Sequence, residues 1–305
     1  MNMEIFAGMV CREVGRRLGE GVCVEVRDVR KNNGTILHGL LARKEGCNVA
    51  PTIYLDTYLE AYERGMPLGP IVRRMLDAYQ ENLVERPVDM GFFRSFERVR
   101  DRICCRLIGR ERNKALLDGI PYIEFLDLAV CFYYAYRGEL GDGMIQIDNS
   151  HMEMWGSNMM ELLALSKRNT PRIRPWECWG LQEIVKEMIE AEGMGNDTAV
   201  PEGILEAVCG DVPMMILTNT IRIHGAACML YPGVLEKMAQ RIGKDFFILP
   251  SSIHEVILLP DTGKESSEAL KEMIRNVNST KVAPEEVLSD TLYRYDSSQG
   301  RVVKA

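Results

Sequence analysis

The sequence is poor in the features that mark membrane-spanning and secreted proteins. Its longest apolar runs, such as the one from Leu126 to Ala135 around Asp127, fall well short of the ~20 residues that cross a bilayer. The start of the chain has no basic segment followed by a long apolar stretch, so we expect no secretory signal. With 46% hydrophobic and 27% charged residues among 305, the composition is that of a soluble globular protein.

Paired cysteines are also missing. The nine cysteines are an odd number, spread along the chain, and no two have C-x-x-C spacing. Most have apolar neighbours, which favours buried free thiols over disulfides or a zinc site. Free thiols persist in a reducing compartment, so we expect a cytoplasmic protein. The net charge of 37 − 44 = −7 makes attraction of the whole molecule to nucleic acid or acidic lipid unexpected.

Common catalytic and cofactor fingerprints are absent. The chain has no G-x-x-x-x-G-K-[ST], no G-x-G-x-x-G after a strand and no G-x-S-x-G. His254-Glu255 begins like the H-E-x-x-H zinc motif, but Leu258 stands where the second histidine belongs. We therefore expect neither a cofactor nor a metal ion, although four histidines remain available for other roles.

The first 85 residues predict the element order α-β-β-β-α-α. Apolar residues recur at helical spacing over 3–18, and Asn33-Gly34 predicts a hairpin turn between strands over 22–29 and 35–43. A third strand over 51–55 follows, then helices over 58–64 and 68–83.

Further along, strands cluster in groups. Residues 122–136 are dense in aromatic and β-branched side chains and predict one buried strand. Other strands are expected over 144–147, 213–218, 226–231, 246–249 and 256–259, and helices over 157–168, 179–191, 234–242 and 266–277. This grouping predicts an α+β fold with mixed or antiparallel sheets and packed amphipathic helices.

The boundary signals predict two closely packed lobes. The run from Gly193 to Asp197 is the strongest of them. We expect an N-terminal α+β lobe over 1–195, divisible near 87, and a C-terminal α+β lobe over 196–278. The polar segment 279–305 has little core-forming material and is expected to form a peripheral tail packed on the domain.

A group of polar residues in the last third is the first candidate site. Its members are Asn219, His224, Ser251, Ser252, His254 and Glu255. These residue types can form a Ser-His-acid arrangement or a two-histidine site. The same serines are also good turn residues, because their hydroxyls can satisfy backbone donors between the strands expected over 246–249 and 256–259. The sequence leaves open whether this group is a site or a structural turn.

A basic stretch is the second candidate. Residues 94–114 contain eight basic and three acidic side chains. If this segment is helical, its basic residues at four-residue spacing form one row, namely Arg94, Arg98, Arg102 and Arg106. Such a row can bind phosphates or an acidic partner, although most charge rows are solvated faces. Separately, Trp155, Trp176 and Trp179 with nearby methionines could line a peptide groove or simply pack the core.

Several short motifs resemble one known family. They are PTIYLD at 51–56, DLA at 127–129, LTN at 217–219 with HGAA at 224–227, LYPGVL at 230–235, LPSSIHEV at 249–256 and PEEVLS at 284–289. Together they extend over about residues 20–295 and resemble the uncharacterised family of anaerobic Gram-positive bacteria catalogued as domain of unknown function 5688. The resemblance implies a bacterial protein whose tail belongs to the domain. It implies no activity and no catalytic residue.

The leading hypothesis is a cytoplasmic, non-enzymatic interaction or scaffold protein that binds a peptide or protein partner. It follows from missing cofactor and nucleophile motifs in a chain with ample core. A hydrolase using the polar group around His224 and His254 is the first alternative. A nucleic-acid-associated protein using the basic row is the second. Neither the oligomeric state nor the identity of the partner is predicted.

Overall fold

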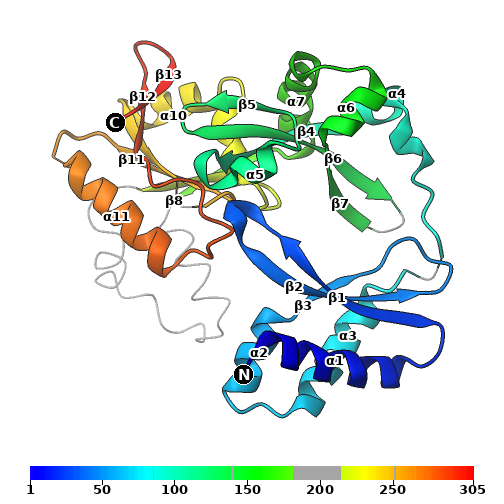
Figure 1. Cartoon of the computed structure of the whole chain (residues 1–305). Helices are drawn as coiled ribbons and strands as arrows, with labels where there is room; N and C mark the ends of the chain where they lie inside the picture. The colour runs from blue at the N-terminus through cyan, green and yellow to red at the C-terminus, as the bar shows by residue number, and fades with distance from the viewer. Residues whose placement is uncertain (85, 139–140, 181–213, 251, 265) are drawn as a thin grey trace, which may run out of the picture. The chain divides into compact units, whose positions relative to one another are not determined.

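The computed structural model describes residues 1–84, 86–138, 141–180, 214–250, 252–264 and 266–305. The chain divides into two compact units, residues 1–92 and 93–305. All described strand pairs are antiparallel, and they form three sheets with helices packed against them (Figure 1). The predicted α+β class is therefore confirmed.

The first unit has the predicted order of elements. In chain order they are α1 (Met3–Leu18), β1 (Val22–Arg30), η1 (Asn32–Gly34), β2 (Ile36–Lys44), β3 (Thr52–Tyr54), α2 (Asp56–Glu63) and α3 (Leu68–Glu81). The hairpin turn is where the sequence places it, because Asn33 and Gly34 both adopt positive φ angles, 60° and 73°. These two residue types tolerate that conformation, which the tight turn between β1 and β2 requires.

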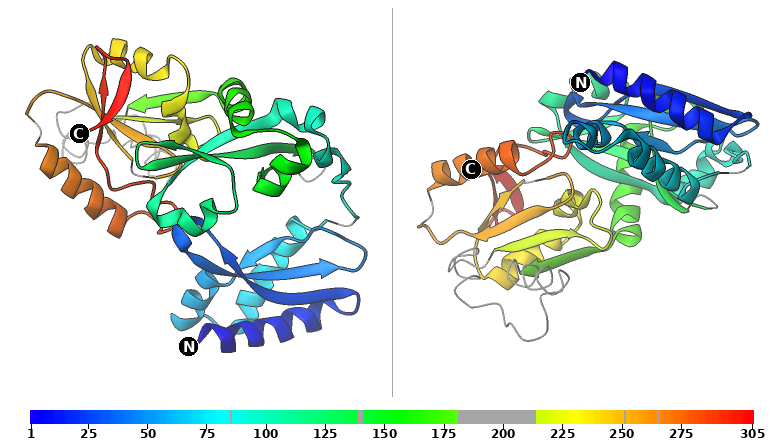
Figure 2. Two further views of the ribbon diagram at one scale, coloured as in Figure 1. Left: turned by 45° about the horizontal axis from the view of Figure 1, so that its top comes forward. Right: turned by 90° about the horizontal axis from the view of Figure 1, so that it is seen from below.

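One helical face and one sheet face make the core of the first unit. Phe6, Val10 and Val14 of α1 are buried together with Leu40 of β2 and Ile71 of α3. The order β1-β2-β3 leaves α1 and α3 to cover the sheet, as Figure 2 shows from two further sides. This core is built entirely from side chains of the first unit.

The second unit contains the remaining elements. Its helices are α4 (Phe96–Val99), α5 (Lys114–Leu117), α6 (Asn149–Trp155), α7 (Met159–Ile173), α10 (Val234–Ile242) and α11 (Ser267–Thr280), with 3-10 turns η3 (Arg100–Arg102), η4 (Glu111–Asn113) and η5 (Gly225–Leu230). Another such turn, η2 (Gly91–Arg94), spans the boundary between the units. The strands are β4 (Ile103–Gly109), β5 (Tyr122–Phe125), β6 (Leu128–Gly138), β7 (Gly141–Gln146), β8 (Trp176–Gly180), β9 (Met215–Asn219), β10 (Phe246–Leu249), β11 (Val256–Pro260), β12 (Tyr293–Asp296) and β13 (Arg301–Lys304).

The four-stranded sheet corrects one prediction. Residues 122–136 do not form a single strand, because the chain reverses at Leu126, whose φ angle is 58°, and Asp127. The result is a hairpin in which β5 pairs with β6. Strand β6 also pairs with β4 on its other edge and with β7 beyond the end of β5. Asp127 is the one charged residue of the apolar run 126–135, and it lies at this turn.

The six-stranded sheet has the order β13-β12-β10-β11-β9-β8. Alternate residues of its strands face α11, where Phe247, Leu259 and Ile274 are buried together. The segment 279–305, expected to carry little core material, supplies β12 and β13. Tyr293 and Leu292 of that segment are fully buried.

Two further expectations differ from the structure. Residues 226–231 were expected as a strand, but 226–230 belong to the 3-10 turn η5, which packs against β9. The helix expected over 179–191 begins inside β8, and its residues from 181 onward lie outside the described part of the chain. The expected lobe boundary at 195/196 also lies outside it, and strands from both sides of that boundary, β8 and β9, pair in one sheet.

Candidate functional site

The predicted polar group is assembled at one end of the six-stranded sheet. Asn219 is the last residue of β9 and is almost fully buried. Its side-chain amide donates to the carbonyl of Ile223 at 2.8 Å, and its Oδ1 accepts from the backbone of Ile221 at 3.1 Å. Asn219 therefore holds the loop that leads to His224. It acts as a turn residue of the kind that competes with regular secondary structure.

The structure brings His224 and His254 into contact across 30 residues. The backbone N–H of His224 donates to Nδ1 of His254 at 3.3 Å, and the two rings stack with centroids 5.7 Å apart. Nε2 of His254 lies 3.5 Å from the carboxylate of Glu286. The His224 side chain is buried, and this burial, followed by repulsion from Arg106 and His254, lowers the pKa of His224 to about 3. His224 is therefore a neutral imidazole at physiological pH.

The turn between β10 and β11 forms as predicted. The hydroxyl of Ser252 accepts from the backbone N–H of His254 at 3.0 Å and donates to Glu255 Oε1 at 2.7 Å. Ser251 lies outside the described residues. The Ser252 proton is thus directed to a carboxylate, and Nδ1 of His254 is already used as an acceptor. A histidine base acting on a serine hydroxyl is not formed by these described residues.

Close packing explains the glycine that follows His224. A Cβ at Gly225 would overlap the hydroxyl of Thr218 and the carbonyl of His254, and it would lie 2.9 Å from the backbone nitrogen of Asn219. The Thr218 hydroxyl donates to that same carbonyl at 2.7 Å. Only glycine lets η5 approach β9 and the β10–β11 turn this closely.

On the surface, part of this group borders a depression of about 430 Å³. Its lining includes Ser252, His254, Glu255 and Glu286, with Arg222 and Lys281 on the same rim. The surface is polar and carries both signs of charge. It brings together three of the predicted site residues, whereas His224 and Asn219 are buried behind it.

The basic stretch is not a helix, so the predicted arginine row does not form. Its residues are divided among η2, α4, η3 and β4. Arg94 and Arg98 are exposed, while the Arg102 side chain donates to the carbonyl of Ala135 at 2.5 Å. Arg106 lies in β4 and donates to the Gln146 side chain at 2.7 Å. The row fails because strand β4 begins at Ile103 and replaces the expected helix.

The predicted tryptophan groove is divided among separate elements. Trp155 belongs to α6, and its indole N–H donates to the carbonyl of Phe93 at 2.8 Å. Its ring also packs against Phe93, with centroids 5.2 Å apart. Trp176 and Trp179 belong to β8. For Trp155, at least, the contacts are those of a packed aromatic cluster.

In the described ranges, no three His, Cys, Asp or Glu side chains are grouped so as to hold a metal ion. None of the helices there combines the length and the apolar character that a membrane span needs.

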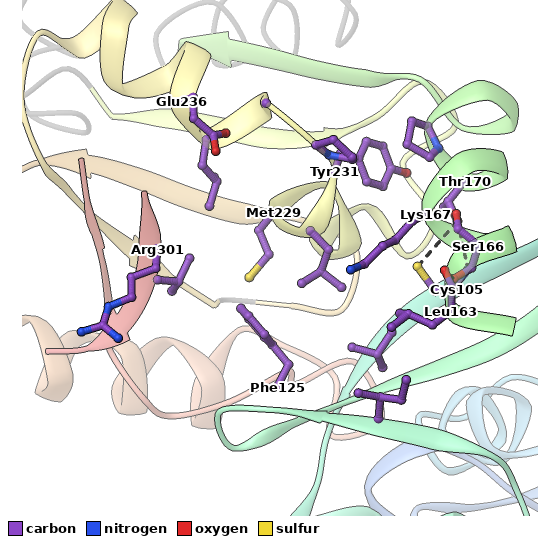
Figure 3. A pocket seen from close by; sticks show the side chains of 18 of the residues that line it. Cys105, Phe125, Leu163, Ser166, Lys167, Thr170, Met229, Tyr231, Glu236 and Arg301 are labelled. Carbon is purple, nitrogen blue, oxygen red and sulfur yellow. Dashed lines mark hydrogen bonds between the residues drawn. The ribbon is translucent and has the colours of Figure 1, made fainter. Parts of the chain in front are cut away.

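A cleft that the sequence did not predict lies elsewhere in the second unit. Its volume is about 410 Å³, and it is bordered by β5, α7, the segment from η5 to α10, and the β12–β13 hairpin. Apolar side chains line most of it, among them Phe125, Leu163, Met229 and Val302. Figure 3 shows these elements around the cleft, with Met229 and Phe125 near its middle.

One wall of the cleft ends in three small polar side chains. The Thr170 hydroxyl donates to the carbonyl of Ser166 at 2.6 Å and accepts from the backbone N–H of Cys105 at 3.1 Å. The Ser166 hydroxyl donates to the carbonyl of Leu163 at 3.0 Å. Cys105 is buried, and burial raises the pKa of its thiol. These groups stabilise the contact between α7 and β4, and a protonated thiol is a poor nucleophile.

The rim of the cleft carries several charged side chains. Lys167 of α7 and Arg301 of β13 have no ion-pair partner among the residues that the structure describes. Glu236 of α10 is a third charge on the rim, while Glu124 is paired with Arg110. In Figure 3 the Lys167 amine points into the cleft and Arg301 lies on the opposite side.

The sequence did hold a signal for the cleft. Residues 230–233, Leu-Tyr-Pro-Gly, line it and belong to one of the motifs on which the family resemblance rests. Tyr231 is anchored there, because its hydroxyl donates to the carbonyl of Arg174 at 3.0 Å. Lys167 and Arg301 are surface cations in a helix and a hairpin, and no local pattern distinguishes them from other surface cations.

Comparison with known proteins gives one match. No curated protein and no solved structure is similar enough to match this chain. A sequence model of one family, described as a family of unknown function, matches residues 3–297. That range includes strand β12, the cleft-lining motif at 230–233 and the whole polar group, whereas strand β13 lies beyond it. The chain therefore belongs to the family catalogued as domain of unknown function 5688.

Proposed function

We propose that this chain is a binding protein that holds an extended peptide segment, carrying an acidic and an apolar side chain, in the cleft of its second unit. The observation that carries the proposal is the cleft itself. An apolar floor lies between two sheet edges, with two cations on the rim that have no ionic partner among the described residues. A volume of about 410 Å³ is within the range of ligand pockets.

The two strands beside the cleft favour an extended peptide. Strand β5 is an edge strand of the four-stranded sheet, and β13 is an edge strand of the six-stranded sheet. Each has one strand neighbour among the described strands, so each presents backbone N–H and C=O groups on its other side. A peptide that adds to such an edge gains main-chain hydrogen bonds, and its alternate side chains point into the adjoining pocket.

Charge determines which peptide fits. Lys167 and Arg301 each offer donors to a carboxylate, and Arg301 can bind one with two parallel hydrogen bonds. Glu236 adds a negative charge to the rim. A rim of mixed sign suits a peptide with acidic side chains better than a nucleic-acid backbone, which needs several cations in series.

The hydrolase alternative rests on the polar group around His254. Its geometry supports structural and binding roles better, because Ser252 donates to Glu255 and His254 accepts from a backbone N–H. The nucleic-acid alternative rested on the arginine row, whose residues lie in four different elements. We therefore favour the peptide-binding function over both.

We further propose that the protein acts in the cytoplasm. The described cysteines are all free thiols, and they include the adjacent pair Cys104 and Cys105. Burial raises the pKa of Cys104, Cys131 and Cys228 to about 12 in each case, which keeps these thiols protonated. Such thiols suit a reducing compartment.

The experiment is a selection from a random peptide library displayed on phage, followed by affinity measurements with synthetic peptides. We expect enriched peptides to carry an acidic residue next to apolar ones. Reversing both cations, Lys167→Glu with Arg301→Glu, should weaken binding of the enriched peptides by at least about tenfold. The matched control is Arg94→Glu, an exposed arginine outside the cleft, which should leave affinity within about twofold. If no sequence is enriched, or if both variants bind equally well, the proposal is wrong.

A further inference from the structure

Two arginines of the second unit are largely removed from solvent, and no carboxylate of the described residues forms an ion pair with either of them. Arg174 is only 8% exposed, and Arg106 is partly buried in β4. Neither forms an ion pair with any residue that the structure describes, and the Nε atom of each is buried without a hydrogen-bond partner there. A charged group that leaves water without an ionic partner destabilises a protein unless something else supplies the opposite charge.

Both arginines are near one face of the four-stranded sheet. Arg106 of β4 is opposite Cys131 of β6, and Tyr133 follows two residues later on the same face. Burial, and after it the Cys104 thiol, raises the pKa of Tyr133, whereas the nearby Arg174 guanidinium acts against that rise. Ile173, just before Arg174, packs against Tyr133 in the same cluster. Tyr133 thus connects the two cations.

His224 completes the group. Its ring centroid lies 6.4 Å from that of Tyr133, and Arg106 is close enough to oppose protonation of the imidazole. His224 is 7% exposed, and its Nδ1 is buried without a partner among the described residues. Three nitrogen atoms, one each from Arg106, Arg174 and His224, therefore have unused hydrogen-bonding capacity in one region.

A hydrogen bond to Gln146 fixes the orientation of the Arg106 side chain. The side-chain amide of Gln146 donates to the carbonyls of Phe132 and Ile147, each at 2.9 Å. Those two bonds direct the Gln146 Oε1 toward Arg106, which donates to it at 2.7 Å. Burial lowers the pKa of Arg106, but an arginine remains protonated at neutral pH, and a neutral amide does not balance its charge.

We propose that Arg106, Arg174 and His224 form a binding site for a small oxyanion, either a phosphate or the carboxylate of an organic acid. Arginine is the preferred partner of both groups because its planar fork matches their oxygen atoms. A neutral imidazole can add an N–H donor. None of the three residues lines the cleft, so the site does not depend on the proposed peptide-binding function.

The test uses the full chain and inorganic phosphate as the first probe. Thermal unfolding and calorimetric titration are followed as phosphate increases, with chloride keeping the ionic strength constant, and succinate serves as the carboxylate probe. We expect one of the two anions to raise Tm saturably. The Arg174→Gln and Arg106→Gln variants should bind it at least about tenfold more weakly. The matched control, Arg94→Gln, changes an exposed arginine and should respond as the wild type does.

The variants should fold, because each replaces a poorly balanced charge by a neutral amide. In anion-free buffer we expect Arg174→Gln to be at least as stable as the wild type. A second measurement needs no variant: the ¹⁵N resonance of the His224 Nδ1 atom should shift saturably with the bound anion. If neither anion raises Tm beyond the chloride control, or if the His224 resonance does not move, the proposal is wrong.

Discussion

The backbone N–H of His224 donates to Nδ1 of His254 at 3.3 Å, and their rings stack at an interplanar angle of 21°. Because Nδ1 of His254 accepts this bond, its proton is on Nε2, which faces the Glu286 carboxylate at 3.5 Å. The two histidines thus join the start of η5 to the β10–β11 turn. This contact stabilises the corner, and of the two side chains only that of His254 lines the surface depression.

The neutral state of His224 gives a pH-dependent stability. Its pKa is about 3 in the folded protein against an ordinary value of 6.5, so the unfolded chain takes up this proton first. The contribution of neutral His224 to the free energy of unfolding is therefore fully present above about pH 6.5, and it decreases as the pH falls toward about 3. Between about pH 7.5 and about pH 5, we expect the wild type to lose about 2 kcal/mol more than His224→Asn.

Denaturant unfolding of both proteins at the two pH values measures this difference. Asparagine is chosen because it tolerates the left-handed backbone at this position, where φ is 55°. An equal loss of stability in the two proteins would contradict this prediction, because it would mean that the pKa of His224 is the same in the folded and the unfolded protein.

Ser252 should contribute to stability through its two hydrogen bonds. In Ser252→Ala the backbone N–H of His254 loses its acceptor and Glu255 loses a donor, so we expect a loss of about 1–2 kcal/mol in the free energy of unfolding. Ser279→Ala is the control, because that hydroxyl is on the exposed side of α11 and bonds the carbonyl of Asn276. Its effect should stay within about 0.5 kcal/mol. Equal effects from the two changes would mean that the Ser252 bonds contribute nothing.

Asp127 should hold the last segment of the chain on the four-stranded sheet. Its carboxylate accepts from the hydroxyls of Ser289 at 2.7 Å, Thr291 at 2.9 Å and Tyr293 at 3.1 Å. Burial would raise the pKa of Asp127, but these hydrogen bonds and the Lys304 amine, 3.4 Å from Oδ1, together keep the pKa below its ordinary value. In Asp127→Asn an amide N–H₂ replaces one acceptor oxygen, so we expect a loss of about 2–3 kcal/mol.

Hydrogen exchange of the β12 amides, together with denaturant unfolding, checks this prediction. Exchange in β12 should accelerate in Asp127→Asn. It should not change in Asp101→Asn, which removes one exposed ion pair with Arg168. Unchanged exchange in both variants would mean that Asp127 does not hold the tail.

Local chemistry explains which parts of the fold were predictable. The Asn33-Gly34 turn and the helix Val234–Ile242 are determined by residues next to one another in the sequence, and both were predicted at their observed places. The turn at Asp127 was missed because its partners, such as Ser289, lie 162 residues away. The 3-10 turn at 225–230 was missed because its apolar composition suits a strand equally well.

In the candidate sites, too, features made by neighbouring residues were predictable and features made by distant residues were not. The β10–β11 turn could be predicted because its flanking strands and its serines are adjacent. The electrostatic effect of Arg106 on His224 could not, since one belonged to the polar group and the other to an expected helical row. The cleft needs Lys167 and Arg301 from segments 134 positions apart to lie on one rim, and only the fold brings them there.

Gly225 should be intolerant of any side chain. Gly225→Ala places a Cβ against the Thr218 hydroxyl and the His254 carbonyl, both fixed by their mutual hydrogen bond, so we expect a loss of at least about 3 kcal/mol. Gly143→Ala is the control in β7, where the nearest atom to a new Cβ is 3.9 Å away. It should cost less than about 1 kcal/mol in denaturant unfolding. A stable Gly225→Ala protein would contradict the packing described for η5.

The central claim, that an extended peptide binds in the cleft, is tested most directly by site-specific photo-crosslinking. A photoreactive phenylalanine derivative replaces Val302, which lines the cleft on β13, or Met160, which is 68% exposed on α7 outside the cleft lining. Each protein is irradiated with a peptide enriched in the phage selection. We predict a covalent adduct from position 302 and none above background from position 160. A bound peptide that crosslinks from position 160 and not from position 302 would contradict the claim.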